Sequence, residues 1–190
     1  MADEKKFYLL KNVRVSFPHL FSRPVINGEE GKAGATLLLD EVEHADTIKE
    51  LKDDITALAK TQFKKDLPDE KKALRLGEEK RDEYTGYYAL SANSKKFPRV
   101  YCHRRMDESG RKPYVVQNED DGCAIYAGCR VNAKVTLWAQ NNQYGKRVNA
   151  ELVAIQFAGD DEAFDGSYVS EDEAADGFQA AAVDEVDFMG

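Results

Sequence analysis

The sequence has few cysteines and no long apolar run. Its 190 residues include three cysteines, an odd number that provides no disulfide framework and fits a reducing cytosol. Apolar runs are short, such as Leu37-Leu38-Leu39, whereas a membrane-spanning helix needs roughly 20 consecutive apolar residues. Residues 1–6 lack the apolar stretch of a secretory signal. These absences argue against a disulfide-rich secreted protein and against a membrane protein.

Basic residues are absent from residues 159–190. This segment holds eleven of the 35 acidic residues and none of the 27 lysines and arginines, so the net charge of −8 divides into −11 for the segment and +3 for residues 1–158. Like-charge blocks of this kind are usually disordered and often serve as interaction tails. We therefore predict one mildly basic domain over residues 1–158, followed by a disordered acidic tail over residues 159–190.

Aromatic residues punctuate the acidic segment, at Phe164, Tyr168, Phe178 and Phe188. A segment that only keeps a protein soluble needs no aromatics, whereas an aromatic beside carboxylates can anchor in an apolar pocket rimmed by cations. Two roles stay open: the tail competes with nucleic acid for a basic groove, or it docks onto a partner protein. The candidate partner-binding residues are Asp184, Glu185, Asp187 and Phe188.

Two strands are expected near the N-terminus. Residues 7–17 alternate with period two, although Lys11 breaks the pattern, and the alternation places on one side Phe7, Leu9, Val13, Val15 and Phe17. Residues 35–39 form a second, shorter strand candidate. The segment 21–34 between them holds Pro24, Gly28, Gly31 and Gly34, which predicts an exposed loop.

Residues 43–82 are expected to insert two helices. Apolar residues recur at steps of three and four over 43–65, and Pro68 suits the first position of a second, charged helix over about 68–82. Strands are then expected over 87–93, 98–105, 113–117, 124–140 and 146–158, with a hairpin loop at 141–145. The predicted fold class is mainly β with inserted helices, which suits a small β-barrel.

Alternation assigns side chains of two strands to faces. Over 130–139 the odd positions are apolar and predict a core face, while the even positions include Arg130, Lys134 and Trp138, the only tryptophan. Over 99–105 the odd positions are Arg99, Tyr101, His103 and Arg105. Single-stranded nucleic acid is bound by this mixture, because aromatic faces stack on any base and cations follow the phosphates.

Neighbouring segments repeat the basic-aromatic mixture. The stretch 95–114 carries seven cations, namely Lys95, Lys96, Arg99, Arg104, Arg105, Arg111 and Lys112, with Phe97, Tyr101 and Tyr114 between them. Lys146 and Arg147 lie beside Tyr144 at the expected hairpin. The alternative interpretation is an ordinary solvated sheet face, with Trp138 covered by the helices.

Other site types fit the sequence less well. Cys102, His103, Cys123 and Cys129 include no Cys-x2-Cys pair, so free buried thiols are favoured over zinc. Acidic clusters at 53–54 and 78–79 lie on helices predicted to be rich in alternating charge, which favours solvated faces over a metal-dependent nuclease. No Walker-type phosphate loop and no nucleophile elbow is present. No catalysed reaction, cofactor or metal is therefore expected.

Three stretches of the chain follow the pattern of a known family: residues 88–100, residues 125–133, and residues 149–157 followed by the acidic tail. In these stretches the chain resembles the OB-fold single-stranded DNA-binding proteins encoded by bacteriophages. The resemblance implies non-enzymatic coating of single-stranded DNA in phage replication, recombination or repair, in the cytoplasm of the host cell. It also implies a tail that contacts replication or recombination proteins. The preference for DNA over RNA comes from this resemblance alone.

The prediction is an OB-like barrel over 1–158, with a helical insertion at about 43–82, that binds single-stranded DNA with little regard to sequence. The expected DNA-binding residues are Trp138, Tyr101, Phe97, Tyr144, Lys95, Lys96, Arg99, Arg105, Arg130, Lys134, Lys146 and Arg147. The alternative is a structural or adaptor protein that binds another protein through its sheet face and tail. The oligomeric state stays open.

Overall fold

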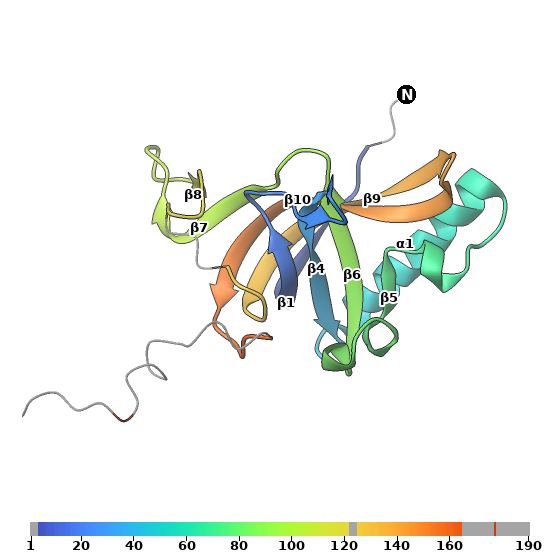
Figure 1. The fold of residues 1–190 in the computed structure, drawn as a ribbon, viewed down its shortest axis with the longest axis horizontal. Helices are drawn as coiled ribbons and strands as arrows, with labels where there is room; N and C mark the ends of the chain where they lie inside the picture. Colours follow the sequence, from blue (N-terminus) through green and yellow to red (C-terminus); the bar gives the residue numbers. More distant parts are fainter. Residues whose placement is uncertain (1–3, 122–124, 165–176, 178–190) are drawn as a thin grey trace, which may run out of the picture.

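Five strands close into a barrel in the computed structural model, which describes residues 4–121, 125–164 and 177 (Figure 1). They are β1 (Phe7–His19), β4 (Ala33–Asp40), β6 (Tyr87–Ser94), β9 (Arg130–Asn142) and β10 (Gly145–Gly159). β1 pairs with β4 and β9, β4 pairs with β6, and β9 pairs with β10, all antiparallel. A parallel pairing of β6 with β10 completes the ring. This architecture confirms the predicted OB-like barrel.

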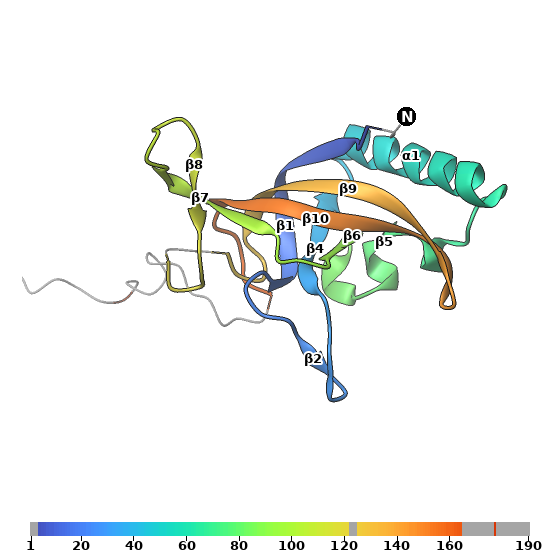
Figure 2. The ribbon, with the colours of Figure 1, turned by 90° about the horizontal axis from the view of Figure 1, so that it is seen from above.

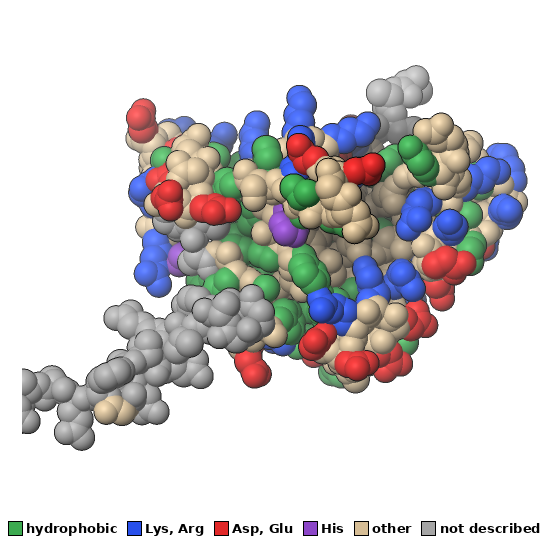
Figure 3. All heavy atoms as spheres, in the orientation of Figure 1, with side chains coloured by type: hydrophobic (Ala, Val, Ile, Leu, Met, Phe, Trp, Pro, Cys, Tyr) green, Lys and Arg blue, Asp and Glu red, His purple; other side chains and the backbone are tan. Residues whose placement is uncertain are grey.

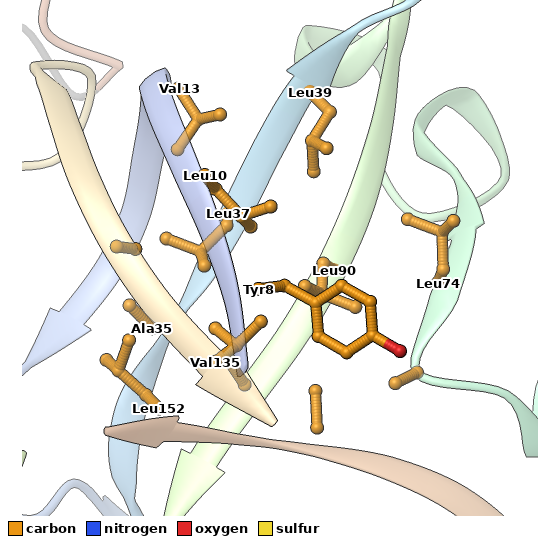
Figure 4. Packing of buried hydrophobic residues seen from close by; sticks show 14 of the residues in the cluster. Tyr8, Leu10, Val13, Ala35, Leu37, Leu39, Leu74, Leu90, Val135 and Leu152 are labelled. Atoms are coloured by element: carbon orange, nitrogen blue, oxygen red, sulfur yellow. The ribbon is translucent and has the colours of Figure 1, made fainter. Parts of the chain in front are cut away.

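The barrel interior is filled by branched side chains from every strand (Figure 4). Leu10, Leu37, Leu90, Val135 and Leu152 are each at most 1% exposed. Burying a side chain of this size contributes roughly 1.5–3 kcal/mol to stability. The barrel is thus a packed core, so a nucleic acid can only reach its outer side.

β1 contains a bulge that the alternation did not predict. The register to β9 shifts between Leu10 and Val13, and Asn12 has a φ of 56°. A one-residue shift exchanges the two faces of a strand. The prediction that Phe7 and Leu9 share a side with the core residues is therefore wrong, because both are about half exposed while Tyr8 and Leu10 are buried.

A second irregularity exposes the far end of the same strand. The register of β1 to β4 shifts between Ser16 and His19, and Phe17 has a φ of 48°. Phe17 is 50% exposed, so the prediction that it shares a side with Val13 and Val15 is also wrong. Val13 and Val15, between the two irregularities, share one side as predicted, and both are fully buried.

Helix α1 (Ala45–Phe63) confirms the first of the two predicted helices. It buries Ile48, Leu51 and Ile55 and contacts β9 and β10, behind the barrel in the view of Figure 1 (Figure 2). The helices among the described residues include none long and apolar enough to cross a membrane.

The prediction of a second helix over 68–82 is wrong. That segment forms the short turns η1 (Asp69–Lys71) and η2 (Gly77–Glu79) on either side of strand β5 (Leu74–Leu76), and η3 (Asp82–Tyr84) follows. β5 pairs with β6, which places Leu74 in the core. Pairing with a strand of the barrel overrides the weak helical periodicity of this segment.

The remaining strands lie outside the barrel. β7 (Arg99–Met106) pairs parallel with β10 and antiparallel with β8 (Pro113–Val116), which extends the sheet beyond the ring (Figure 1). β2 (Val25–Ile26) and β3 (Glu29–Glu30) form a small hairpin within the predicted loop 21–34, and it projects from the barrel (Figure 2). The predicted strand over 124–140 begins only at Arg130, since residues 125–129 form a turn.

Residues 160–164 lie against the barrel beyond the end of β10. Arg130 Nε lies 2.7 Å from an Asp161 carboxylate oxygen, and the Tyr126 hydroxyl donates to Asp160 at 2.9 Å. The Phe164 ring packs edge-on against Tyr84, 5.9 Å between centroids. The first acidic residues after β10 are therefore held in place.

Candidate nucleic-acid interface

A groove of about 640 Å³ crosses the outer side of the extended sheet. Its lining comes from five strands and the turn before β8: Phe7, Leu9, Arg99, Tyr101, Lys112, Pro113, Asn132, Lys134, Val153, Ala154, Ile155 and Gln156. The extra residue Val153 of β10 forms a bulge between Leu152 and Ala154. Bulges bend a strand and re-aim its side chains, and this one lies in the floor of the groove.

Strand register aligns the groove residues in two rows. In the first row Leu9, Lys134, Ala154 and Arg99 are partners in turn across β1, β9, β10 and β7. In the second row Asn132, Gln156, Tyr101 and Val115 are partners across β9, β10, β7 and β8. Side chains directly opposite on neighbouring strands lie close together. The first row places the small side chain of Ala154 between Lys134 and Arg99, and the second row places Tyr101 beside Gln156.

The cations of the groove are available to a ligand. The ion pairs among the described residues include neither Arg99, Lys112 nor Lys134. Lys134 Nζ lies 5.6 Å from the centroid of the Phe7 ring. Exposed aromatics beside unpaired cations can stack on bases and neutralise phosphates. The described residues contain no cluster of His, Cys, Asp and Glu side chains that could hold a metal ion.

Trp138 continues the groove face along β9. It is 36% exposed, on the same side of the strand as Lys134, while Val131, Ala133 and Val135 are buried. The predicted division of β9 into a core face and a basic-aromatic face is confirmed at these positions. Thr136 between them is buried, and its hydroxyl donates to the Lys6 carbonyl.

Two of the predicted DNA-binding arginines are held by other groups of the chain. Arg130 pairs with Asp161 and donates to the Asn12 carbonyl, and its side chain is only 21% exposed. Arg105 pairs with Asp121 at 3.2 Å and stacks on Tyr114, with its guanidinium carbon 3.4 Å from the ring centroid. Neither lines the groove.

The other predicted residues lie in two loops. Lys95, Lys96 and Phe97 are exposed between β6 and β7, where Arg23 stacks on Phe97 at 5.2 Å. This loop leads directly into Arg99 of the groove.

At the β9–β10 hairpin, Tyr144 is 74% exposed. Lys146 lies 5.6 Å from the Phe63 ring of α1, and Arg147 donates to the Glu70 carbonyl. The structure therefore does not bring Tyr144, Lys146 and Arg147 together with the groove. Asp184, Glu185, Asp187 and Phe188 lie outside the described residues, as does Cys123.

The sequence interpretation missed Phe7 and Leu9 as groove residues. Alternation placed both on one side with Val13 and Val15, because the bulge at residues 11–12 was not anticipated. A signal was present, since Lys11 interrupts the apolar alternation and an unbroken strand would have placed its charge among core residues.

Comparison with known proteins shows the same fold and family. The family model of the single-stranded DNA-binding protein of Enterobacter phage Enc34 matches residues 7–189. The putative protein p50 of Acyrthosiphon pisum secondary endosymbiont phage 1 is 32% identical, over 93% of this chain and 96% of that protein.

Solved structures of the Enc34 protein are similar as well. Its structure alone is 26% identical with a TM-score of 0.72, and each chain covers 90% of the other. Its structure in complex with single-stranded DNA is 26% identical with a TM-score of 0.71, over 83% of this chain and 89% of that one. These relatives are binding proteins and not enzymes. The chain belongs to the family of the single-stranded DNA-binding protein of bacteriophage Enc34.

Proposed function

We propose that the protein binds single-stranded DNA in the groove across β1, β9, β10, β7 and β8, and coats and protects single strands during phage DNA replication, recombination or repair. The main observation is that two aromatics, Phe7 and Tyr101, line one groove together with three cations that form no ion pair with any residue the structure describes. Membership of the Enc34 family supports the proposal. The host cytoplasm is where such a protein would meet its DNA.

The groove residues have two proposed roles, stacking on bases and neutralising phosphates. Phe7 and Tyr101 stack on bases, with Trp138 extending the path along β9, and Arg99, Lys112 and Lys134 neutralise phosphates. Stacking tolerates any base because every base has a π-face. The protein would therefore bind with little sequence preference.

The acidic segment is proposed to contact replication or recombination proteins, or to compete with DNA for the cations. This proposal rests on the composition of the segment, which combines carboxylates with Phe188. The first acidic residues of the segment, Asp160 and Asp161, lie next to Tyr126 and Arg130 of the barrel domain.

The test is a fluorescence-polarisation titration with oligo-dT of 30 nucleotides and with a duplex of equal length, from 50 to 300 mM salt. On single strands the logarithm of the association constant falls by about 0.7 per phosphate contact for each decade of salt. The three groove cations should thus contribute a slope of about −2, which is roughly a 40-fold loss over this range.

The matched variant for this test is Arg99→Gln with Lys134→Gln, which removes two of the three contacts. Its slope should be shallower than that of the wild type by about 1.4. A flat salt response of the wild type, or equal affinity for the duplex, contradicts the proposal. Absence of binding to either probe would favour the adaptor alternative.

A further inference from the structure

A second basic surface lies on the outer side of β4, β5 and β6, whose strands do not line the groove. Figure 3 shows lysine and arginine side chains gathered over β5 and β6 on the face toward the viewer. Register places Thr36 of β4 beside Ser91 of β6, and Arg75 of β5 beside Ala89 of β6. Leu74 and Leu90 point into the barrel core, so these partners lie on the opposite side of the sheet, where Ala89 is buried with Leu38 and Tyr84.

Arg75 and Lys80 are two half-buried cations of this surface. Arg75 Nε is buried and makes no hydrogen bond within the described part of the chain. Lys80 Nζ donates to Ser91 Oγ at 2.6 Å. No ion pair among the described residues includes either cation.

The two charges also act on each other. Burial, and after it the positive charge of Arg75, lower the pKa of Lys80. Like charges that are partly withdrawn from water are unfavourable unless an anion neutralises them. A buried N–H donor without an acceptor carries its own desolvation cost. Both observations favour binding of an anion with acceptor oxygens at this position.

An exposed aromatic, Phe17, lies beside Arg81, the residue that follows Lys80 in the chain. Phe17 is 50% exposed and holds a left-handed backbone conformation, and the guanidinium of Arg81 lies 4.9 Å from its ring centroid. Left-handed conformations are unfavourable for a bulky residue and cluster at ligand-binding positions. Arg81 itself pairs with Glu83 at 3.4 Å, so it positions the ring rather than meeting an anion.

We propose that Arg75, Lys80 and Ser91 form a seat for a phosphate group of the bound DNA strand, with the adjacent base on Phe17. The strand would pass from the groove over the β6–β7 loop, with its exposed Lys95 and Lys96, onto the β4–β6 face (Figure 1). This inference rests on the proposed single-stranded DNA binding and extends its path.

The test compares two double variants that each remove two positive charges. Arg75→Gln with Lys80→Gln removes the seat, and Lys49→Gln with Lys60→Gln removes two exposed charges from helix α1. Polarisation titrations use oligo-dT of 20 nucleotides from 50 to 300 mM salt. The seat variant should lose about 1.4 from the salt slope and bind roughly 10- to 100-fold more weakly at 50 mM, while the α1 variant stays within about twofold of the wild type.

Folding and ligand source are separated by further measurements. Thermal melts verify that each variant is folded. If the double variant unfolds, the single Lys80→Gln variant replaces it, and its salt slope should be shallower by about 0.7. An unchanged slope in a folded Lys80→Gln variant overturns the inference. The second experiment is a calorimetric titration with inorganic phosphate. If phosphate binding requires Lys80 while oligo-dT binding of the Lys80→Gln variant is unchanged, the site binds free phosphate. That result also overturns the inference. If the wild type fails to bind oligo-dT, the proposed function itself is wrong.

Discussion

Replacing Tyr101 with alanine is expected to weaken binding of single-stranded DNA by roughly 5- to 150-fold, the equivalent of about 1–3 kcal/mol for one lost stacking platform. Tyr101 lies in the second row of the groove, between Gln156 and Val115, and its side chain is only partly covered. Phe7→Ala should have a similar effect from the opposite wall. Equilibrium titration with oligo-dT at fixed salt measures both.

The control for this prediction is Tyr144→Ala. Tyr144 is more exposed than either groove aromatic but lies at the β9–β10 hairpin, outside the groove. Its loss should change affinity by less than about twofold, because an aromatic that no base reaches contributes no stacking. A larger loss with Tyr144→Ala than with Tyr101→Ala would move the interface to the hairpin and contradict the groove.

Replacing Gly128 with alanine is expected to destabilise the protein by about 3–4 kcal/mol. Gly128 has a φ of 110°, and a Cβ there would lie 2.3 Å from the Glu162 carbonyl oxygen. Because that contact is with backbone, residues 160–164 must move, which breaks the Asp161–Arg130 pair and the packing of Phe164 on Tyr84. Thermal unfolding should show a fall in Tm of roughly 6–16 °C.

Gly145→Ala is the matched control for this change. Gly145 has a similar φ of 102°, but no atom lies within 4 Å of the position that its Cβ would take. Alanine there meets only the left-handed backbone conformation, at a cost of roughly 1–2 kcal/mol. Equal losses in the two variants would show that residues 160–164 do not dock on the barrel in solution.

Much of the fold could be predicted from periodicity, because each barrel strand has one side in the core. Alternation over β9 placed Val135 inside and Lys134 and Trp138 outside, as found. Helix α1 was predicted from the spacing of Ile48, Leu51 and Ile55, all of which are buried. In β9 and α1 the spacing of apolar residues within the segment itself is sufficient to predict the element and its buried side.

The wrong predictions of local structure fall in segments whose conformation depends on pairing with strands distant in sequence. β5 forms in a segment with a helix-like pattern because Leu74 pairs with Leu90 of β6. The bulge at residues 11–12 exchanges the faces of β1 and exposes Phe7. Neither strand pairing nor bulge position is encoded in the periodicity of a single segment.

Only part of the candidate site could be predicted, because the site also depends on contacts between residues distant in sequence. Arg99, Tyr101 and Lys134 were expected on basic-aromatic faces, and strand pairing brings them together. Arg130 and Arg105 belong to the same alternating patterns, but Asp161 and Asp121 hold them. Which cation remains unpaired depends on acids distant in sequence, and the pattern of one strand does not reveal them.

The measurement that tests the central claim most directly is photocross-linking of the full-length protein to an oligo-dT that carries 5-iododeoxyuridine, with mass spectrometry of the adducts. The aromatics nearest the bound bases should react, so we expect adducts at Tyr101, Phe7 and Trp138, lost when duplex replaces the single strand. A saturated complex with no adduct at these three residues, and with adducts at Tyr144 instead, would contradict the assignment of the groove as the DNA-binding site.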